Sequence, residues 1–202
     1  YKTNTPYGLA PDAKQKDNQY LATNDARVLH AVELNNKIFY IQNCVQPSNG
    51  RAGMYLGTIA GLSTTPSITG KIIAYDSLEL GYPAISAIGR FPADEKCVIY
   101  VNFVRKNGFA GCMALYKDKQ NNISPPLILK EGDGNVNRLI DTVERWGDYS
   151  GMQQLYWDPN TVITAGYYGK SNAQHDAWIS KVQLNDSNSV SAQKNIPTLP
   201  VK

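Results

Sequence analysis

The chain alternates short runs of apolar, β-branched and aromatic residues with clusters of Gly, Asn, Asp and Pro. No segment carries an apolar stripe with a 3.6-residue period over a dozen positions, so the pattern predicts no long amphipathic helix. The clearest predicted strands are the apolar runs at residues 37–42, 97–102 and 161–166. Short strands at regular spacing, bounded by turn residues, predict an all-β sandwich, barrel or propeller.

These three strands belong to a repeated unit. Ile38, Val98 and Val162 are separated by 60 and 64 residues along the chain. A similar run precedes and another follows each position by about a dozen residues, and a fourth closes the first two units. Three copies of a four-stranded antiparallel meander are typical of β-propeller blades, which bury their faces by packing on neighbouring blades.

The repeat divides the chain into three regions. Residues 1–22 predict an irregular N-terminal arm, because they show little hydrophobic periodicity. The three predicted blades span residues 23–80, 81–140 and 141–184. Residues 185–202 predict a polar C-terminal tail. Because closed propellers contain roughly four to eight blades, we expect part of a larger ring, or a ring completed by a companion chain or a homo-oligomer.

Composition fits a β-rich extracellular protein and excludes several other classes. The chain is 42% hydrophobic and 18% charged and contains 13 Tyr, which excludes disorder, collagen and coiled coil. No run of apolar residues is long enough to predict a membrane-spanning helix. Lys and Arg exceed Asp and Glu by only three and are scattered, so no nucleic-acid-binding face is predicted. We expect a secreted or cell-surface protein.

The chain has three cysteines, Cys44, Cys97 and Cys112. An odd number argues against a disulfide framework, and the spacing fits no zinc site. The Asn107-Gly108 dipeptide predicts a two-residue type I′ turn, which sets Cys112 opposite Phe103 and far from Cys97. We therefore expect all three to be small buried hydrophobic residues without a disulfide.

Three motifs resemble those of one protein family. The segment Arg145-Trp-Gly-Asp-Tyr-Ser-Gly151, followed by Asp158-Pro159, is similar to a signature of secreted bacterial β-propeller proteins with sialidase-like architecture. Thr23-Asn-Asp-Ala-Arg27 and Tyr82-Pro-Ala-Ile85 complete the resemblance, which implies a sialidase-like propeller. The Asp-box of catalytic sialidases, Ser-x-Asp-x-Gly-x-x-Trp, does not occur in the chain. The resemblance therefore supports the fold rather than an activity.

Charged and aromatic residues lie ahead of the predicted inner strands, where the loops of a propeller converge on one mouth of the channel. The candidate ligand-binding residues are Asn24, Asp25, Arg27, Tyr82, Arg145, Trp146, Asp148 and Tyr149. Aromatic rings at such a mouth stack on sugars, and charged groups bind hydroxyls. In an architectural alternative, the carboxylates cap turns, the arginines pair with them, and Trp146 packs between blades.

The sequence thus predicts a binding or assembly module for a glycan or protein ligand, with no catalysis in this chain and no cofactor. One alternative is a fragment of a sialidase-like glycoside-acting enzyme whose missing catalytic residues lie on blades outside this chain. Asp25 and Asp148 are a separate candidate acid–base pair for glycoside hydrolysis, but no spacing in the sequence brings them within reach of each other. Another is a structural subunit that assembles with copies of itself. Asn24-Asp25 and Gly147-Asp148 carry oxygen ligands suited to calcium, but neither resembles an EF-hand loop.

Overall fold

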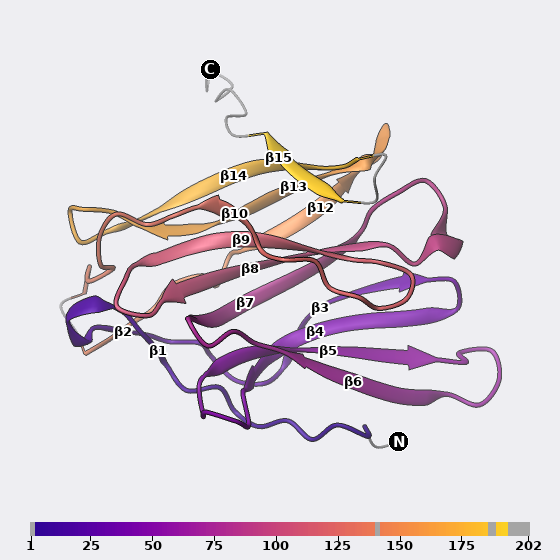
Figure 1. Cartoon of the computed structure of the whole chain (residues 1–202), viewed down its shortest axis with the longest axis horizontal. Helices are drawn as coiled ribbons and strands as arrows, with labels where there is room; N and C mark the ends of the chain where they lie inside the picture. The colour runs from indigo at the N-terminus through magenta and orange to yellow at the C-terminus, as the bar shows by residue number, and fades with distance from the viewer. Residues whose placement is uncertain (1–2, 140–141, 186–188, 194–202) are drawn as a thin grey trace.

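The computed structural model describes residues 3–139, 142–185 and 189–193. Over this part of the chain the protein is all-β, without an α-helix, and forms one three-stranded and three four-stranded sheets. Figure 1 shows the four-stranded sheets stacked in chain order, the first at the bottom and the third at the top. The predicted all-β class and the repeated four-stranded antiparallel unit are confirmed. The described residues do not form a closed ring, and the arrangement of the sheets as propeller blades stays a prediction.

The first sheet is an antiparallel meander with its strands in chain order. Its strands are β3 (Val28–Leu34), β4 (Lys37–Val45), β5 (Ala52–Ala60) and β6 (Ser67–Ile73). Because side chains alternate along a strand, Phe39 and Ile41 point into the core shared with the second sheet. On the other face, Ile38, Ile59 and Ile68 are cross-strand neighbours in one row.

The second sheet lies between the other two, so both of its faces are covered (Figure 1). Its strands are β7 (Leu78–Ala87), β8 (Cys97–Arg105), β9 (Ala110–Lys117) and β10 (Leu127–Lys130). Nearly every residue of β7, β8 and β9 is buried, which explains their almost continuous apolar sequence. A short 3₁₀ helix, η2 (Pro92–Asp94), lies in the connection from β7 to β8.

The third sheet packs one face on the second sheet and leaves the other uncovered by described residues. Its strands are β12 (Gly151–Leu155), β13 (Asp158–Gly169), β14 (His175–Leu184) and β15 (Val190–Gln193). Met152, Val162 and Val182 form its side of the shared core. On the opposite face Ile179 is 51% exposed. β15 lies beyond residue 184, in the segment for which the sequence predicted a tail.

The N-terminal segment forms a small sheet at one end of the molecule. The segment contains β1 (Ala13–Lys14), the 3₁₀ helix η1 (Lys16–Asn18) and β2 (Tyr20–Leu21). The third strand of the sheet is β11 (Val143–Glu144), which pairs in parallel with β2. The buried Gln15 side chain donates to the carbonyl of Val136 at 2.9 Å and accepts its N–H at 2.8 Å. The carboxylate of Glu79 accepts the Lys14 N–H at 2.6 Å, which fixes this sheet to the start of β7.

Residues preceding the small sheet lie along the outer face of the first sheet (Figure 1). The Thr5 hydroxyl donates to the Gly70 carbonyl at 2.7 Å, and the Gly70 N–H donates to Asn4 Oδ1 at 3.2 Å. The rings of Tyr7 and Tyr55 lie 4.9 Å apart. This segment therefore covers part of the face that the second sheet does not reach.

The cysteine prediction is confirmed, but the predicted register of one hairpin is wrong. Cys44, Cys97 and Cys112 are all buried and free. Cys112 pairs with Asn102 rather than with Phe103. The Arg105 N–H donates to the Phe109 carbonyl at 3.3 Å, so three residues, not two, connect the strands and shift the register by one.

No helix in the described part of the chain is long and apolar enough to cross a bilayer.

Candidate functional site

The loop ahead of β3 is closed by an ion pair between two of its own residues. Arg27 Nε donates to both carboxylate oxygens of Asp25, at 2.7 and 2.8 Å, and the Arg27 backbone N–H donates to the same carboxylate at 3.1 Å. The hydrogen bonds from Arg27 lower the pKa of Asp25. Asn24 adopts a φ of 65°, and its side chain accepts the Asp25 N–H at 2.9 Å. Asp25 is thus held ionised within a tight turn.

Behind this loop, the buried side chain of Asn43 on β4 joins two sheets. Asn43 Nδ2 donates to the carbonyl of Thr23, and Asn43 Oδ1 accepts the backbone N–H of Tyr82 at 2.9 Å. One amide therefore holds the loop ahead of β3 against the first strand of the second sheet. Both hydrogen bonds are buried, where breaking them is costly, so they hold the loop in one position.

Tyr82 lies at an irregularity in β7, where the pairing with β8 shifts between Gly81 and Ala84. Its φ is 54°, a conformation that the extra residue of a β-bulge accommodates. The ring is 6% exposed and packs edge-on against Trp146, with centroids 6.3 Å apart. Burial raises the pKa of the Tyr82 hydroxyl, and the Asp148 carboxylate raises it further. Tyr82 therefore belongs to the core beneath the loops.

The loop ahead of β12 is held in place by a buried side chain, Trp146, and exposes another, Tyr149. Trp146 is 2% exposed and lies in an apolar cluster with Tyr82. Gly147 has a φ of 77°, and a Cβ at this position would come within 2.5 Å of the Tyr82 ring. Only glycine fits both the backbone conformation and this close approach. Beyond it, the Tyr149 side chain is 87% exposed.

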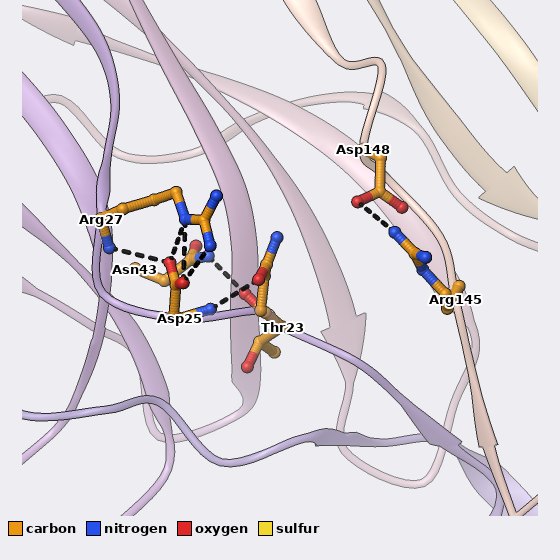
Figure 2. Close-up of polar contacts among 7 residues, drawn as sticks. Thr23, Asp25, Arg27, Asn43, Arg145 and Asp148 are labelled. Carbon is orange, nitrogen blue, oxygen red and sulfur yellow. Dashed lines mark hydrogen bonds and ion pairs between the residues drawn. The ribbon is translucent and has the colours of Figure 1, made fainter.

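Arg145 and Asp148 form an ion pair at 3.3 Å within this second loop. Figure 2 shows the Asp25–Arg27 and Arg145–Asp148 pairs on separate loops, each arginine directed at the aspartate of its own loop. The structure thus combines two self-contained ion pairs with one exposed aromatic ring. Of the predicted site residues, Tyr82 and Trp146 are buried, and the other six lie in the two loops.

Asn102 on β8 is a second buried amide that the sequence reasoning missed, as it missed Asn43. Asn102 Nδ2 donates to the Ser150 hydroxyl at 2.6 Å, and Oδ1 accepts the N–H of Tyr167 at 3.1 Å. It ties the second sheet to the loop and strand of the third, as Asn43 ties the first sheet to the second. The available signal was an Asn in the middle of an otherwise apolar strand.

The carboxylates of this region do not gather into a metal centre. Across residues 3–139, 142–185 and 189–193, no three His, Cys, Asp or Glu side chains lie close enough together to hold a metal ion. Asp25 and Asp148 each bond an arginine. The two loops present hydrogen-bonding groups, paired charges and the exposed ring of Tyr149.

Comparison of the chain with protein-family models, curated proteins and solved structures finds no match. Inference about function therefore rests on the geometry described above.

Proposed function

We propose that this chain is a non-catalytic binding module, secreted or displayed on a cell surface, whose loops ahead of β3 and β12 bind a glycan or protein ligand. One observation carries the proposal: Tyr149 is 87% exposed on a loop that is itself anchored by the buried Trp146. Because its loop is held by the buried Trp146, the ring has a fixed place at the surface, where a ligand can contact it. Such a ring can stack on a sugar or fill a protein pocket.

The neighbouring ion pair supplies polar contacts beside the ring. Arg145 offers guanidinium N–H donors, and Asp148 offers carboxylate acceptors, within three residues of each other and next to Tyr149. Sugar hydroxyls both donate and accept hydrogen bonds, so this pair of groups suits a saccharide. The Asp25–Arg27 pair repeats the same chemistry on the loop ahead of β3.

The proposed architecture is that of three consecutive blades of a sialidase-like propeller. The inner strands β3 and β12 both contact β7, as adjacent blades would around an axis. Asn43 and Asn102 repeat the same bridge, each from the second strand of one sheet to the region ahead of or within the first strand of the next. A companion chain or further copies of this chain would complete such a ring.

The state of the carboxylates favours binding over glycoside hydrolysis. A general acid needs a raised carboxyl pKa, whereas hydrogen bonds from Arg27 lower that of Asp25. Asp148 forms an ion pair with Arg145 of its own loop. Turnover of chromogenic glycosides by the wild-type chain that disappeared in Asp148→Asn would overturn the non-catalytic assignment.

The direct test is a glycan array followed by titration calorimetry on the hits. Tyr149→Ala should weaken binding by about fivefold or more through loss of the stacked ring, whereas Tyr149→Phe should stay within about threefold. Thermal melts of both variants would establish that they remain folded. Equal affinity of wild type and Tyr149→Ala for every hit would contradict the proposed site.

Self-assembly is a second candidate function, favoured by the uncovered face of the third sheet. On this face Ile179 is the cross-strand partner of Ala165, and its side chain is 51% exposed. A second copy packed on this face would bury it. Light scattering at micromolar concentration should show an oligomer that Ile179→Lys dissociates. A monomeric wild type would contradict self-assembly.

A further inference from the structure

A second surface lies at the opposite end of the strands that carry the proposed site. Tyr82 lies midway along β7, at its bulge, and Tyr149 lies two residues ahead of the start of β12. Gly89 follows the end of β7, and Trp157 follows the end of β12. Because a strand is extended, groups at its two ends face different sides of the molecule. This surface is therefore separate from the Tyr149 loop.

The two connections at this end are bonded to each other. The Gly89 N–H donates to the Pro159 carbonyl at 2.8 Å. The Gln154 side-chain amide donates to both the Gly89 carbonyl, at 3.1 Å, and the Pro159 carbonyl, at 2.8 Å. Gly89 has a φ of 100°, which only glycine adopts readily. The β7–β8 connection and the base of the β12–β13 hairpin thus form one rigid unit.

A hollow of about 330 Å³ lies beside this bonded unit, between the second and third sheets. Its lining includes two cations, Arg90 and Lys96, one carboxylate, Asp94, the ring of Phe91 and the amide of Asn160. The volume falls at the lower end of the range for small-ligand pockets, roughly 300–1,000 Å³. The hollow therefore accommodates one or two sugar rings, and the rest of a longer saccharide would extend beyond it.

The lining groups have unused binding capacity. Phe91 is 64% exposed, and Trp157 on the adjoining hairpin is 78% exposed. The Arg90 guanidinium and the Asn160 amide form no hydrogen bond or ion pair with the described residues. Lys96 pairs with Asp94 at 3.4 Å. A cation, an amide and an aromatic face, all without internal partners, line one concave surface.

We propose that this hollow binds an acidic saccharide. Arg90 pairs with the sugar carboxylate, because a guanidinium matches a carboxylate in charge and geometry. The Asn160 amide, which both donates and accepts, bonds the ring hydroxyls. Phe91 packs against the C–H face of the ring. An acidic peptide could pair with the cation and bond the amide through its backbone, but tetraglutamate has no C–H ring face to pack on Phe91. The inference is independent of the Tyr149 site.

The test is calorimetric titration with tetragalacturonate, with its fully methyl-esterified form and with tetraglutamate. Wild type should bind tetragalacturonate about tenfold more tightly than either other probe, because both the charge and the sugar are recognised. Arg90→Gln and Phe91→Ala should each weaken binding several-fold. Lys106→Gln, which removes an exposed cation elsewhere, should leave binding unchanged, as should Tyr149→Ala.

Each contrary result is specific. Failure of wild type to bind tetragalacturonate at millimolar concentration overturns the inference. Equal affinity for the methyl ester refutes the role of Arg90, and equal affinity for tetraglutamate identifies an acidic peptide surface instead. Loss of binding in Tyr149→Ala but not in Arg90→Gln moves the saccharide to the loop ahead of β12, which rejects this site while supporting the proposed function.

Discussion

The side chain of Asn43 accepts the backbone N–H of Tyr82 at 2.9 Å, which joins the second strand of one sheet to the bulged first strand of the next. The same amide donates to the Thr23 carbonyl. The loop ahead of β3 and strand β7 are thus held together by one buried side chain. Removing such a side chain destabilises the fold mainly because its former hydrogen-bond partners remain buried without a partner.

Asn43→Ala should lower the free energy of unfolding by about 2–3 kcal/mol, because it leaves the Tyr82 N–H and the Thr23 carbonyl buried without partners. Urea denaturation measures this directly. Asn160→Ala is the matched control, because that amide is exposed and makes no internal bond. A loss below about 0.5 kcal/mol in Asn43→Ala would show that the bridge is dispensable.

Gly147→Ala should destabilise the protein by about 2 kcal/mol or more. The backbone there has a φ of 77°, and the added Cβ would come within 2.5 Å of the Tyr82 ring. Gly151→Ala, four residues on, is the control, since a Cβ there meets nothing within 4 Å. The two variants should differ clearly in thermal midpoint. Indistinguishable midpoints would contradict the close packing of Gly147 on Tyr82.

Stability should fall steadily at alkaline pH. Burial raises the pKa of the Cys44 thiol to about 12, so the folded protein keeps a proton that the unfolded chain releases above about pH 8.5. The unfolded state then binds fewer protons, and the free energy of unfolding drops between about pH 9 and the folded pKa. Cys44→Ala should flatten this slope by up to about 1.4 kcal/mol per pH unit.

The measurement is a series of urea unfolding curves from pH 8 to 11 under reducing conditions. Ala114→Gly provides the comparison, because it disturbs a buried position without removing an ionisable group. That variant should be less stable than wild type at every pH while keeping the wild-type slope. An unchanged slope in Cys44→Ala would contradict the burial of its thiol.

The Asp25 carboxyl should titrate below its ordinary range, because hydrogen bonds from Arg27 favour its charged form. Its contribution to stability is present above the ordinary carboxyl pKa and is lost as the pH falls through the lowered value. Carboxyl-carbon NMR of labelled protein would follow the titration. Arg27→Gln should raise the pKa of Asp25, whereas Arg145→Gln should not, since Arg145 bonds Asp148. An ordinary pKa for Asp25 in wild type would contradict its pairing with Arg27 and would again allow it to act as a general acid.

Local sequence was sufficient to predict the repeated hairpins. The alternation of apolar and polar residues locates strands such as β4 and β8, because side-chain orientation in a strand follows a two-residue period. The burial of Cys44, Cys97 and Cys112 without a disulfide was predicted from their odd number and their spacing. The positions of the strands within each hairpin could therefore largely be predicted from the sequence.

Contacts between sheets could not be predicted from the sequence in the same way. The burial of Tyr82 depends on a bulge, where one extra residue changes the direction of every side chain nearby. The register of Cys112 depended on one residue in the turn around Asn107. Asn43 and Asn102 act across sheets, and no spacing along the chain encodes which backbone groups they meet. The exposed ring of Tyr149 is likewise a result of packing beneath it.

The pairing of β2 with β11 constrains the order in which the protein can be completed during synthesis. Gln15 bonds Val136, 121 residues further along the chain. A ribosome-bound chain could form the first hairpins early, but the N-terminal segment must wait for most of the translated chain before its own sheet can close. Until then, that segment would offer unpaired backbone groups to whatever else was nearby. Slow translation ahead of Val136 would therefore be a period of vulnerability to chaperone capture or misassociation.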